Sequence, residues 1–342
     1  DMYEHRFGSK PKQTYQTPLE SGDHPELDTS EFLDDEGIEI YQSLIGSMQW
    51  AISIGRYDIH TAVMTMSSFR VQPRVGHLDR LKRMFGYLCK FRHYKIRFRT
   101  EEPDFSAVPC VEYDWSNTTY GNGEEDLPKD APPPLGKRVV LTHYFDANLM
   151  HDVLSGKAVT GIFHLMNKTP MMWYSKKQAT SETATYGSEF IACRTCLEQI
   201  IDIRNSFRYL GVEVYSKSYV FGDNAAQINS AKVPQAKLNK RHNILSFHFV
   251  RDMISKGFIL LSHIPSEFNA ADIMTKQWKY QASYLHLLKP FLNHEGNVGD
   301  LFENDDCYGE FPESSFTCNS VLNVTVGENE EIQTHAIEIG NY

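Results

Sequence analysis

Three consecutive prolines divide the chain into two parts whose hydrophobic patterns differ. They lie in the segment Ala131–Gly136, where the lack of backbone donors on proline favours an extended chain. Before this segment the apolar residues recur every three or four positions, which predicts helices. After it, short apolar runs come first and then alternate with helical patterns. That order predicts an α/β fold, a mixed five-stranded sheet with helices packed on it.

The part before the prolines is predicted to hold three helices. Their apolar periodicity covers Tyr41–Ile52, Tyr57–Phe69 and His77–Phe91, and together they predict a small helical domain over residues 41–99. Residues 1–40 show little periodicity and are rich in Pro, Ser and Asp, so we expect an acidic lead-in, mostly irregular. Residues 100–136 contain nine acidic residues and one Lys, and we interpret them as an acidic, Pro-rich linker.

The part after the prolines is predicted to form one domain over residues 137–295, followed by an acidic flexible tail over 296–342. Its expected elements are strands over Val139–Asp146, Ala158–Met166 and Met171–Ser175, a helix over Glu182–Tyr209, a strand over Tyr219–Asp223, a helix from Asn224, a basic helix over Lys237–Lys256, a strand over Phe258–Ile264 and a helix from Asn269. The four-residue turn Asn167–Pro170 predicts that the second and third strands pair as a hairpin.

The net charge of −10 conceals a basic body between two acidic flanks. Residues 20–39 hold nine acidic residues and 300–342 hold ten, neither segment with a Lys or Arg, whereas residues 74–99 hold nine basic residues against one Asp. The overall acidity therefore does not exclude a polyanionic partner. A hydrophobic content of 41% excludes wholesale disorder. No apolar run is long enough to span a membrane and no signal peptide is evident, so we expect an intracellular protein with reduced cysteines.

Four carboxylates occupy positions where burial is costly unless they are paired or bind metal. Asp146 and Asp223 end predicted strands, Glu189 lies beside the apolar stripe of the long helix, and Asp272 opens the last helix. If the two strands are neighbours, these four groups can converge, and Mg²⁺ or Mn²⁺ is their natural neutraliser. Two ions would suit in-line cleavage of a phosphodiester. A single Asp at such a position is more often a cap or a turn former.

Several stretches resemble the ribonuclease H domain of copia-type LTR retrotransposon polyproteins. In chain order they are YFDANLMHD, KKQATSETATYGSEFIA, FGDNAAQ, KRHNILSFHFVRD and AADIMTK, which cover roughly residues 139–290. The helical part resembles the region that follows the palm of the reverse transcriptase in the same polyproteins. The stretches YQSLIGSMQWAISIGRYDIHTAVMTMSSF and HLDRLKRMFGYLCKF carry that likeness.

The resemblance implies a ribonuclease H-like fold and cleavage of the RNA strand of RNA–DNA hybrids. It also implies that Asp146, Glu189, Asp223 and Asp272 are catalytic metal ligands, and that the remainder of a reverse transcriptase and integrase polyprotein is a partner. The compartment would be the cytoplasm, within a virus-like particle, or the nucleus. A polymerase site needs paired aspartates on a hairpin, and Asp34-Asp35 stand in a non-strand context, so we expect no polymerase chemistry.

Hybrid binding requires cationic and polar groups along two nucleic-acid backbones. The candidates are Lys176, Lys177, Asn224, Gln227, Lys237, Lys240, Arg241, Arg80, Lys82 and Arg83. Each of them can equally be a solvated surface residue. His263, nine residues before Asp272, is either a catalytic helper or a strand histidine, and Asp152 is either an outer acid or a loop cap.

Two other functions fit parts of the pattern. A non-catalytic relic of the same domain would bind nucleic acid through its basic residues without cutting it. A strand transferase of the integrase type would share the fold class, but it normally uses three acids in a different layout.

Overall fold

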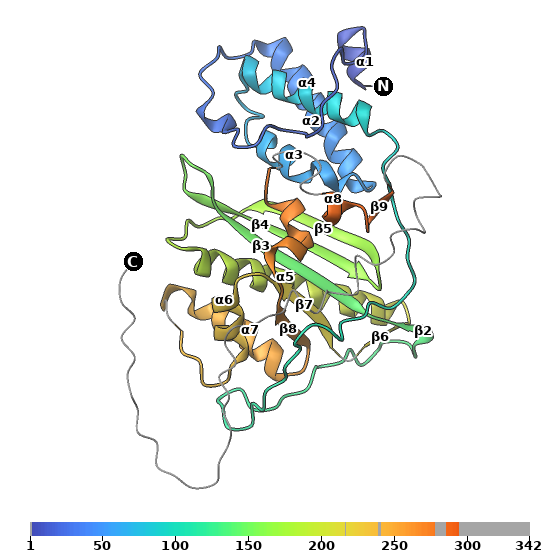
Figure 1. Ribbon diagram of the computed structural model, residues 1–342, viewed down its shortest axis with the longest axis vertical. Helices are drawn as coiled ribbons and strands as arrows, with labels where there is room; N and C mark the ends of the chain where they lie inside the picture. Colours follow the sequence, from blue (N-terminus) through green and yellow to red (C-terminus); the bar gives the residue numbers. More distant parts are fainter. Residues whose placement is uncertain (1, 216, 239–240, 278–284, 294–342) are drawn as a thin grey trace.

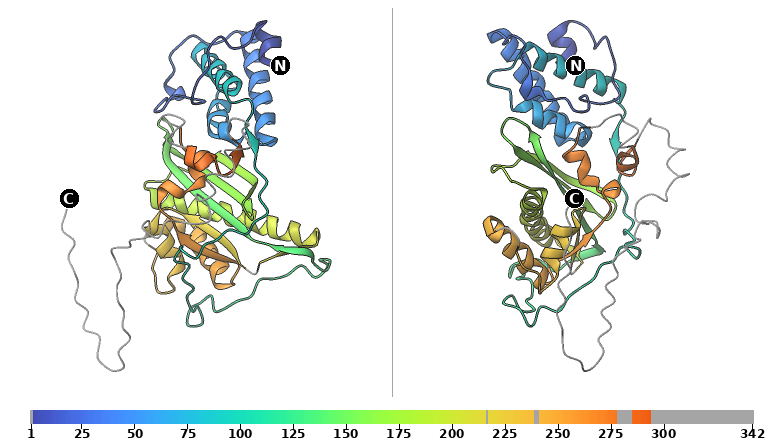
Figure 2. Two further views of the ribbon diagram at one scale, coloured as in Figure 1. Left: turned by 45° about the vertical axis from the view of Figure 1, so that its right-hand side comes forward. Right: turned by 60° about the vertical axis from the view of Figure 1, so that its left-hand side comes forward.

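The computed structural model describes residues 2–215, 217–238, 241–277 and 285–293 (Figure 1). A central sheet separates two helical layers. One layer is the N-terminal helical part, and the other consists of helices α5 to α7 (Figure 2). Among the described helices, none is both long and apolar enough to cross a membrane.

The central sheet has five strands in the order β5-β4-β3-β7-β8. The strands are β3 (Leu141–Asp152), β4 (Lys157–Met166), β5 (Thr169–Lys177), β7 (Ser218–Gly222) and β8 (Ile259–His263). The first three pair antiparallel, and β7 and β8 continue the sheet in parallel from β3. Asn167 has a φ of 53° in the β4–β5 turn, a left-handed conformation that Asn tolerates well. The predicted mixed five-stranded sheet and its hairpin are confirmed.

Alternation along the strands gives each face of the sheet its own core. Phe145, Ile162 and Val220 lie in the core beneath α5 (Thr185–Tyr209), α6 (Ala225–Lys232) and α7 (Ile244–Ser255). Their strand neighbours Tyr144, Phe163 and Phe221 lie in the other core. The period of two along a pleated strand produces this division.

The second face is covered by the N-terminal helical part. Its helices are α1 (Met2–Phe7), α2 (Asp35–Ser53), α3 (His60–Ser67) and α4 (Val75–Lys90), with 3-10 turns η1 (Pro25–Leu27) and η2 (Tyr57–Ile59). The Tyr57 ring lies 5.0 Å from that of Phe163 and 5.3 Å from that of Trp173. Trp173 also donates its indole N–H to the carbonyl of Ile52, at 3.1 Å. The helices and the sheet therefore share one hydrophobic core, and their division into separate domains stays a prediction.

Smaller elements differ from the sequence expectation. The remaining ones are β1 (Lys95–Ile96), β2 (Leu135–Val139), β6 (Val212–Val214), η3 (Arg241–Asn243), η4 (Ser266–Phe268), η5 (Ala270–Met274), α8 (Leu285–Leu288) and β9 (Leu292–Asn293). The strand predicted to start at Val139 is split, because β2 pairs with β6 outside the main sheet. The predicted last helix is the 3-10 turn η5, and the basic helix is the shorter α7. The predicted tail, residues 296–342, lies outside the described residues.

The acidic linker is a strap fastened along the sheet and α5. The ring of Phe105 packs 4.7 Å from that of Tyr219 and 5.0 Å from that of Phe221. Further along, Glu125 accepts hydrogen bonds from Arg204 and Arg208, both on α5. The prolines do keep the chain extended, but acidic and aromatic side chains before them bind it to the body.

Two histidines form a buried pair between β3 and β4. The Nδ1 atoms of His143 and His164 are 2.7 Å apart, and His164 Nε2 lies 2.7 Å from the amide oxygen of Gln199 on α5. Because that oxygen can only accept, His164 carries its proton on Nε2 and accepts from His143 through Nδ1. Protonating His164 would set two N–H groups against each other. Burial lowers the pKa of His164 to about 4, although the bond to Gln199 opposes this.

Acidification should therefore destabilise the protein through this pair. The folded pKa of His164 is below the usual 6.5, so the unfolded chain binds more protons between pH 6.5 and 4, and stability falls as the pH falls. We expect His164 to contribute a loss of about 3 kcal/mol across this window. Urea unfolding at pH 6.5 and 4.5 should show a smaller loss in His164→Gln than in wild type. The exposed control His93→Gln should lose as much as wild type, and equal losses in all three would contradict the prediction.

Candidate metal centre

The sheet register brings two of the predicted carboxylates together. Strands β3 and β7 are parallel neighbours with Tyr144 opposite Phe221, so Asp146 comes level with Asp223, which directly follows β7. Asp272 joins them from η5. These three residues can each offer an oxygen such that all the oxygens lie within 4.8 Å of one another. Asp146 and Asp272 are buried and Asp223 is half-buried.

Asp272 is positioned by the close packing of η5 on the sheet. Asn269, fully buried, accepts a hydrogen bond from the backbone N–H of Ala271 and donates one to the carbonyl of Phe145, at 3.1 and 3.0 Å. Gly161 lies opposite Asp146 on β4, and a Cβ there would come within 2.4 Å of Thr275 and 2.9 Å of the Ala271 carbonyl. Only glycine leaves room for η5 at this point.

Glu189 lies beside the cluster on the first half of α5. Its Oε1 accepts a hydrogen bond from the backbone N–H of Ala147 at 3.3 Å. Its Oε2 is buried and has no hydrogen-bond partner among the described residues. Burial raises the pKa of Glu189 well above its usual value, and the charges of Asp146 and Asp223 raise it further. Glu189 is thus close enough to sense the three aspartates, although it is not one of the three grouped oxygens.

The same crowding affects the aspartates. Burial raises the pKa of Asp146, and Asp223 adds to this while Lys276 opposes it. Burial, with repulsion from Asp146, raises the pKa of Asp272 to about 7. Four carboxylates held this close repel one another. An all-oxygen, all-carboxylate donor set with one unpartnered buried oxygen fits a hard divalent cation such as Mg²⁺ or Mn²⁺.

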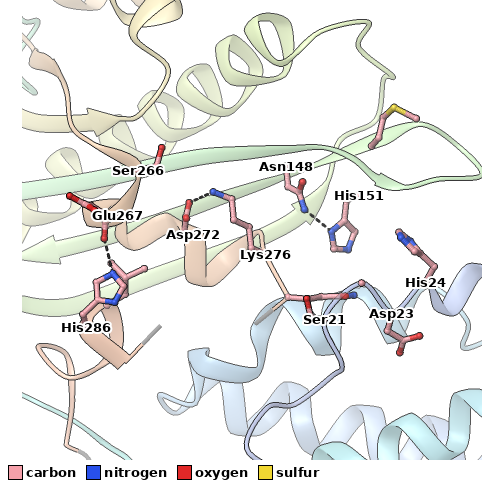
Figure 3. A pocket seen from close by; sticks show the side chains of 14 residues that line it. Ser21, Asp23, His24, Asn148, His151, Ser266, Glu267, Asp272, Lys276 and His286 are labelled. Carbon is pink, nitrogen blue, oxygen red and sulfur yellow. Dashed lines mark hydrogen bonds and ion pairs between the residues drawn. The ribbon is translucent and has the colours of Figure 1, made fainter. Parts of the chain in front are cut away.

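A cation of the chain itself, Lys276, also lies in the cluster. The Nζ of Lys276 donates to Asp272 Oδ1 at 2.6 Å and lies 3.9 Å from Asp146 Oδ2 (Figure 3). Thr275 adds a hydrogen bond from its hydroxyl to Asp146 Oδ2. Burial alone would lower the pKa of Lys276, but the carboxylates of Asp146 and Asp272 raise it above its usual value.

A cavity of about 590 Å³ opens beside the cluster. It is lined by Asp272 and Lys276 from the site, by Asn148 and His151 from β3, and by the lead-in loop around His24 (Figure 3). The lead-in loop therefore lines the cavity that lies beside the carboxylates.

Sequence reasoning missed three residues that shape this site. Asn269 and Thr275 fix η5 against β3, and Lys276 neutralises part of the cluster. Thr275 and Lys276 are the last two residues of the stretch AADIMTK, and Asn269 directly precedes it. Only the four-residue spacing of Asp272 and Lys276 could have indicated a contact, since it matches a helical pair.

The nucleic-acid candidates near the sheet have mixed environments. Lys176, Lys237 and Arg241 are exposed, while Lys177 pairs with Asp152 at 2.7 Å. Asp152 also accepts from the backbone of Leu154 and Ser155 and is thus a loop cap. Lys240 lies outside the described residues.

Two further candidates follow β7. The side chain of Asn224 caps α6 by accepting from the backbone of Gln227, at 3.0 Å. The prediction for Gln227 is wrong, because this residue belongs to α6 and its side chain is fully buried, so that it cannot reach a nucleic acid. His263 is on β8 as the pattern indicated, with Nε2 3.1 Å from the carbonyl of Asp223.

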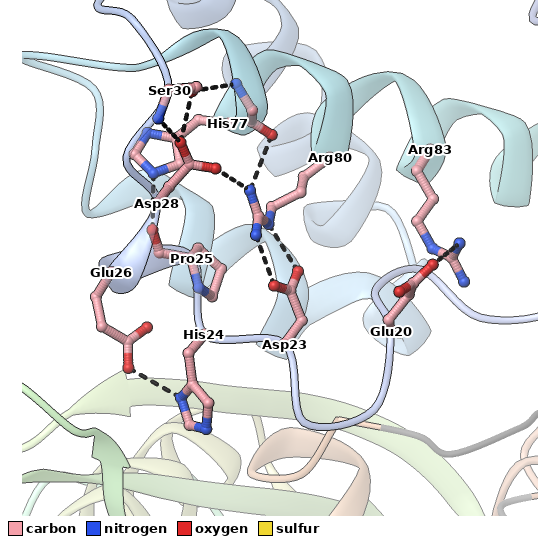
Figure 4. A network of polar contacts seen from close by, with 11 residues as sticks. Glu20, Asp23, His24, Pro25, Glu26, Asp28, Ser30, His77, Arg80 and Arg83 are labelled. Carbon is pink, nitrogen blue, oxygen red and sulfur yellow. Dashed lines mark hydrogen bonds and ion pairs between the residues drawn. The ribbon is translucent and has the colours of Figure 1, made fainter.

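The basic face of α4 is occupied by the acidic lead-in (Figure 4). Arg80 binds Asp23 through two hydrogen bonds of 2.7 Å and also contacts Asp28. Arg83 pairs with Glu20 at 2.9 Å, and Lys82 pairs with Asp79 on its own helix at 2.9 Å. Arg80 and Arg83 are thus not open cations in this structure, because carboxylates of the lead-in pair with them. Contact of Arg80, Lys82 or Arg83 with phosphate stays a prediction that requires these pairs to open.

The paired aspartates considered for polymerase chemistry belong to a helix start. Asp34 caps α2 by accepting from the backbone N–H of Gly37 at 2.8 Å, and Asp35 is the first residue of that helix. Neither lies on a β-hairpin.

Comparison with known proteins places these observations in context. The chain is 24% identical over 237 residues to the retrovirus-related Pol polyprotein from transposon TNT 1-94 of Nicotiana tabacum. It is 23% identical over 236 residues to that from transposon RE1 of Arabidopsis thaliana. Each alignment covers 69% of this chain but only 15% and 14% of the relatives, so the chain spans about one seventh of their length. No family model matches the chain. The resemblance to a retrotransposon polyprotein fragment is confirmed.

Solved structures include ribonucleases H among the similar chains. RNase H1 from Halobacterium salinarum NRC-1 is 17% identical, with 41% of this chain and 95% of that one covered, at a TM-score of 0.31. LC11-RNase H1 in complex with RNA/DNA hybrid is 18% identical, with 40% and 93% covered, at a TM-score of 0.33. The predicted fold class, a mixed five-stranded sheet flanked by helices, is confirmed by the strand order described above.

Proposed function

We propose that this chain is a metal-dependent endoribonuclease that cleaves the RNA strand of RNA–DNA hybrids within a retrotransposon polyprotein. The observation that carries the proposal is the convergence of Asp146, Asp223 and Asp272 with the unpartnered, buried Glu189 beside them. Buried carboxylates that raise one another's pKa are typical of functional sites.

The four carboxylates have distinct supports. Asp146 lies on β3, Asp223 directly follows the neighbouring strand β7, Asp272 lies on the turn η5, and Glu189 lies on α5. They would hold the divalent ions against a sheet that fixes the spacing of their oxygens, and Lys276 is the cation of the described chain that pairs with them. Two such ions would activate a water for in-line attack on the phosphodiester and stabilise the leaving 3′ oxygen. Residues of this chain would then orient the scissile strand in the adjoining cavity.

The proposed substrate needs contacts along both backbones of a duplex. The exposed Lys176, Lys237 and Arg241 are the best placed cations for such contacts, and their loss should weaken binding without selecting for sequence. The chain would act as one part of a polyprotein that also supplies reverse transcriptase and integrase. Its site of action would be a virus-like particle in the cytoplasm, or the nucleus.

The proposal is tested by following a hybrid labelled on the RNA strand. With Mg²⁺ we expect endonucleolytic cuts in the RNA, and with a chelator none, because the carboxylates alone cannot activate water. Single-stranded RNA and a DNA duplex of the same sequence serve as controls and should stay intact. Asp223→Asn should remove cleavage but retain binding of the hybrid.

The non-catalytic alternative gives a different result in the same assay. The non-catalytic relic would bind the hybrid in a salt-sensitive way without cleaving it, and neither Asp223→Asn nor the metal would change this binding. That result would contradict the proposed nuclease function.

A further inference from the structure

Lys276 is the side chain in the metal centre that the proposed reaction leaves without a role. Its ammonium binds Asp272 at 2.6 Å and faces Asp146 at 3.9 Å. Asp272 and Asp146 are two of the three residues whose oxygens come together as a ligand set. The ammonium therefore sits on the oxygens that a divalent ion would need.

The charges of the centre show why a cation belongs there. Asp146, Asp223 and Asp272 meet within 4.8 Å, and Glu189 adds a buried carboxylate beside them. Within the described part of the chain, Lys276 is the only Lys or Arg that forms an ion pair with any of these four acids. A metal-free chain thus depends on one ammonium to offset several carboxylates, and a divalent ion arriving at the same oxygens would meet a like charge.

The structure also offers the Lys276 ammonium an alternative position in the cavity beside the metal centre. The Lys276 side chain is 35% exposed and lines the cavity of about 590 Å³ beside the centre. The same cavity is bordered by polar side chains, among them Asn148 and Ser266. A lysine has a long flexible stem and three donors, so it can exchange a carboxylate for these groups or water at little cost.

We propose that Lys276 is a tethered counter-ion of the metal centre: it occupies the Asp146–Asp272 oxygens in the metal-free chain and must leave them for a divalent ion to bind. The inference rests on the proposed function, since it assumes that the cluster binds metal. It assigns to Lys276 a positioning role, which makes metal binding a competition within the chain and protects the carboxylates from mutual repulsion before loading.

The test measures metal affinity directly. Titration of the metal-free chain with Mn²⁺, followed by the electron paramagnetic resonance signal of the free ion, gives the dissociation constant without any substrate. Lys276→Met keeps the stem but removes the competitor, so we expect Mn²⁺ to bind at least about tenfold more tightly. Lys276→Arg keeps a cation that binds carboxylates through a two-pronged fork, so we expect weaker Mn²⁺ binding than in wild type.

A matched control is the Lys256–Asp252 ion pair at the C-terminal end of α7. Lys256 pairs with Asp252 at 2.8 Å with the same four-residue spacing, and its side chain has the same exposed fraction, 35%. Lys256→Met should leave Mn²⁺ affinity unchanged. Heat denaturation with a chelator should show Lys276→Met less stable than wild type, with a larger rise in melting temperature on adding Mn²⁺.

The outcomes separate this inference from the proposed function. Unchanged or weaker Mn²⁺ binding in Lys276→Met, where wild type binds the ion, would overturn the counter-ion role alone. A wild-type chain that binds no Mn²⁺ at the cluster, with the same result in Asp146→Asn, would overturn the metal-dependent function and the inference together. If Lys276→Met does not fold, the comparison of Lys276→Arg with wild type still decides, because equal or tighter binding by Arg contradicts competition.

Discussion

Glu189→Gln should abolish hybrid cleavage and at the same time make the metal-free protein more stable. The expected loss of activity is at least about 100-fold, since a ligand that helps metal ions to stabilise charge contributes several kcal/mol to the transition state. The expected gain in the free energy of unfolding is about 1 to 3 kcal/mol, the usual cost of leaving a buried polar atom unpaired.

The opposite effects of Glu189→Gln on activity and on stability follow from the surroundings of the Glu189 side chain. Oε2 of Glu189 is buried without a hydrogen-bond partner in the described part of the chain, and burial and the charges of Asp146 and Asp223 raise the pKa of this carboxyl. Glutamine has the same shape and can still accept from the backbone N–H of Ala147. Its amide group carries no charge and can donate toward the aspartates. The folded state thus loses repulsion but also loses a metal ligand.

Melting temperature with a chelator and cleavage with Mg²⁺ are the two measurements. The control is Glu198→Gln, on the exposed side of the same helix, where the side chain is 48% exposed and pairs with Arg194 at 2.8 Å. This control should retain full cleavage and change stability by less than about 0.5 kcal/mol. A Glu189→Gln variant that is both inactive and destabilised would show that the carboxylate supports the fold, and the functional assignment of Glu189 would fail.

Periodicity was enough to predict the elements around Asp146, Glu189 and Asp223, but not the one that carries Asp272. The alternation of Tyr144 and Phe145 between two cores is visible in the sequence as a strand, and Asn167 marks the hairpin turn. The last helix was predicted wrongly: η5 is a 3-10 turn that ends at Met274, and the residues at its two ends, Asn269 and Thr275, are hydrogen-bonded to β3. Such tertiary contacts overrule local helix propensity.

The charge pattern was harder to interpret than the fold. An acidic lead-in and a basic helix were predicted as separate features, but Asp23 and Arg80 bind each other across 57 residues. In the same way, nothing in the sequence indicated that Lys276 faces Asp146, and Gln227 was predicted to bind nucleic acid although its side chain is buried. Sequence gives the sign of each charge but not its partner, because partners are set by the packing of distant elements. The linker shows this most strongly, since its acids hold it to α5.

Loss of the Glu125 carboxylate should destabilise the protein more than any other change in the linker. Arg204 is fully buried on α5 and binds Glu125 through Nε and Nη2, at 3.0 and 2.6 Å, while Arg208 adds bonds of 2.7 and 2.6 Å. Hydrogen bonds from both arginines lower the pKa of Glu125 against the opposing effect of burial. Glu125→Gln removes the carboxylate charge that pairs with this buried guanidinium, and breaking such a buried pair costs about 3 to 5 kcal/mol.

The appropriate control is an Arg–Glu ion pair that also lies near the linker but is exposed to solvent. Arg138 and Glu213 are joined at 2.9 Å, with side chains 51% and 36% exposed, and Glu213→Gln should cost at most about 1 kcal/mol. Urea unfolding of both variants gives the two free energies.

Because Arg204 also donates to the Tyr215 carbonyl and the Ser218 hydroxyl at the start of β7, disorder of the strap should spread to the strand that leads to Asp223. Glu125→Gln should therefore weaken Mn²⁺ binding as well, and a variant no less stable than Glu213→Gln would show that the linker is only a spacer.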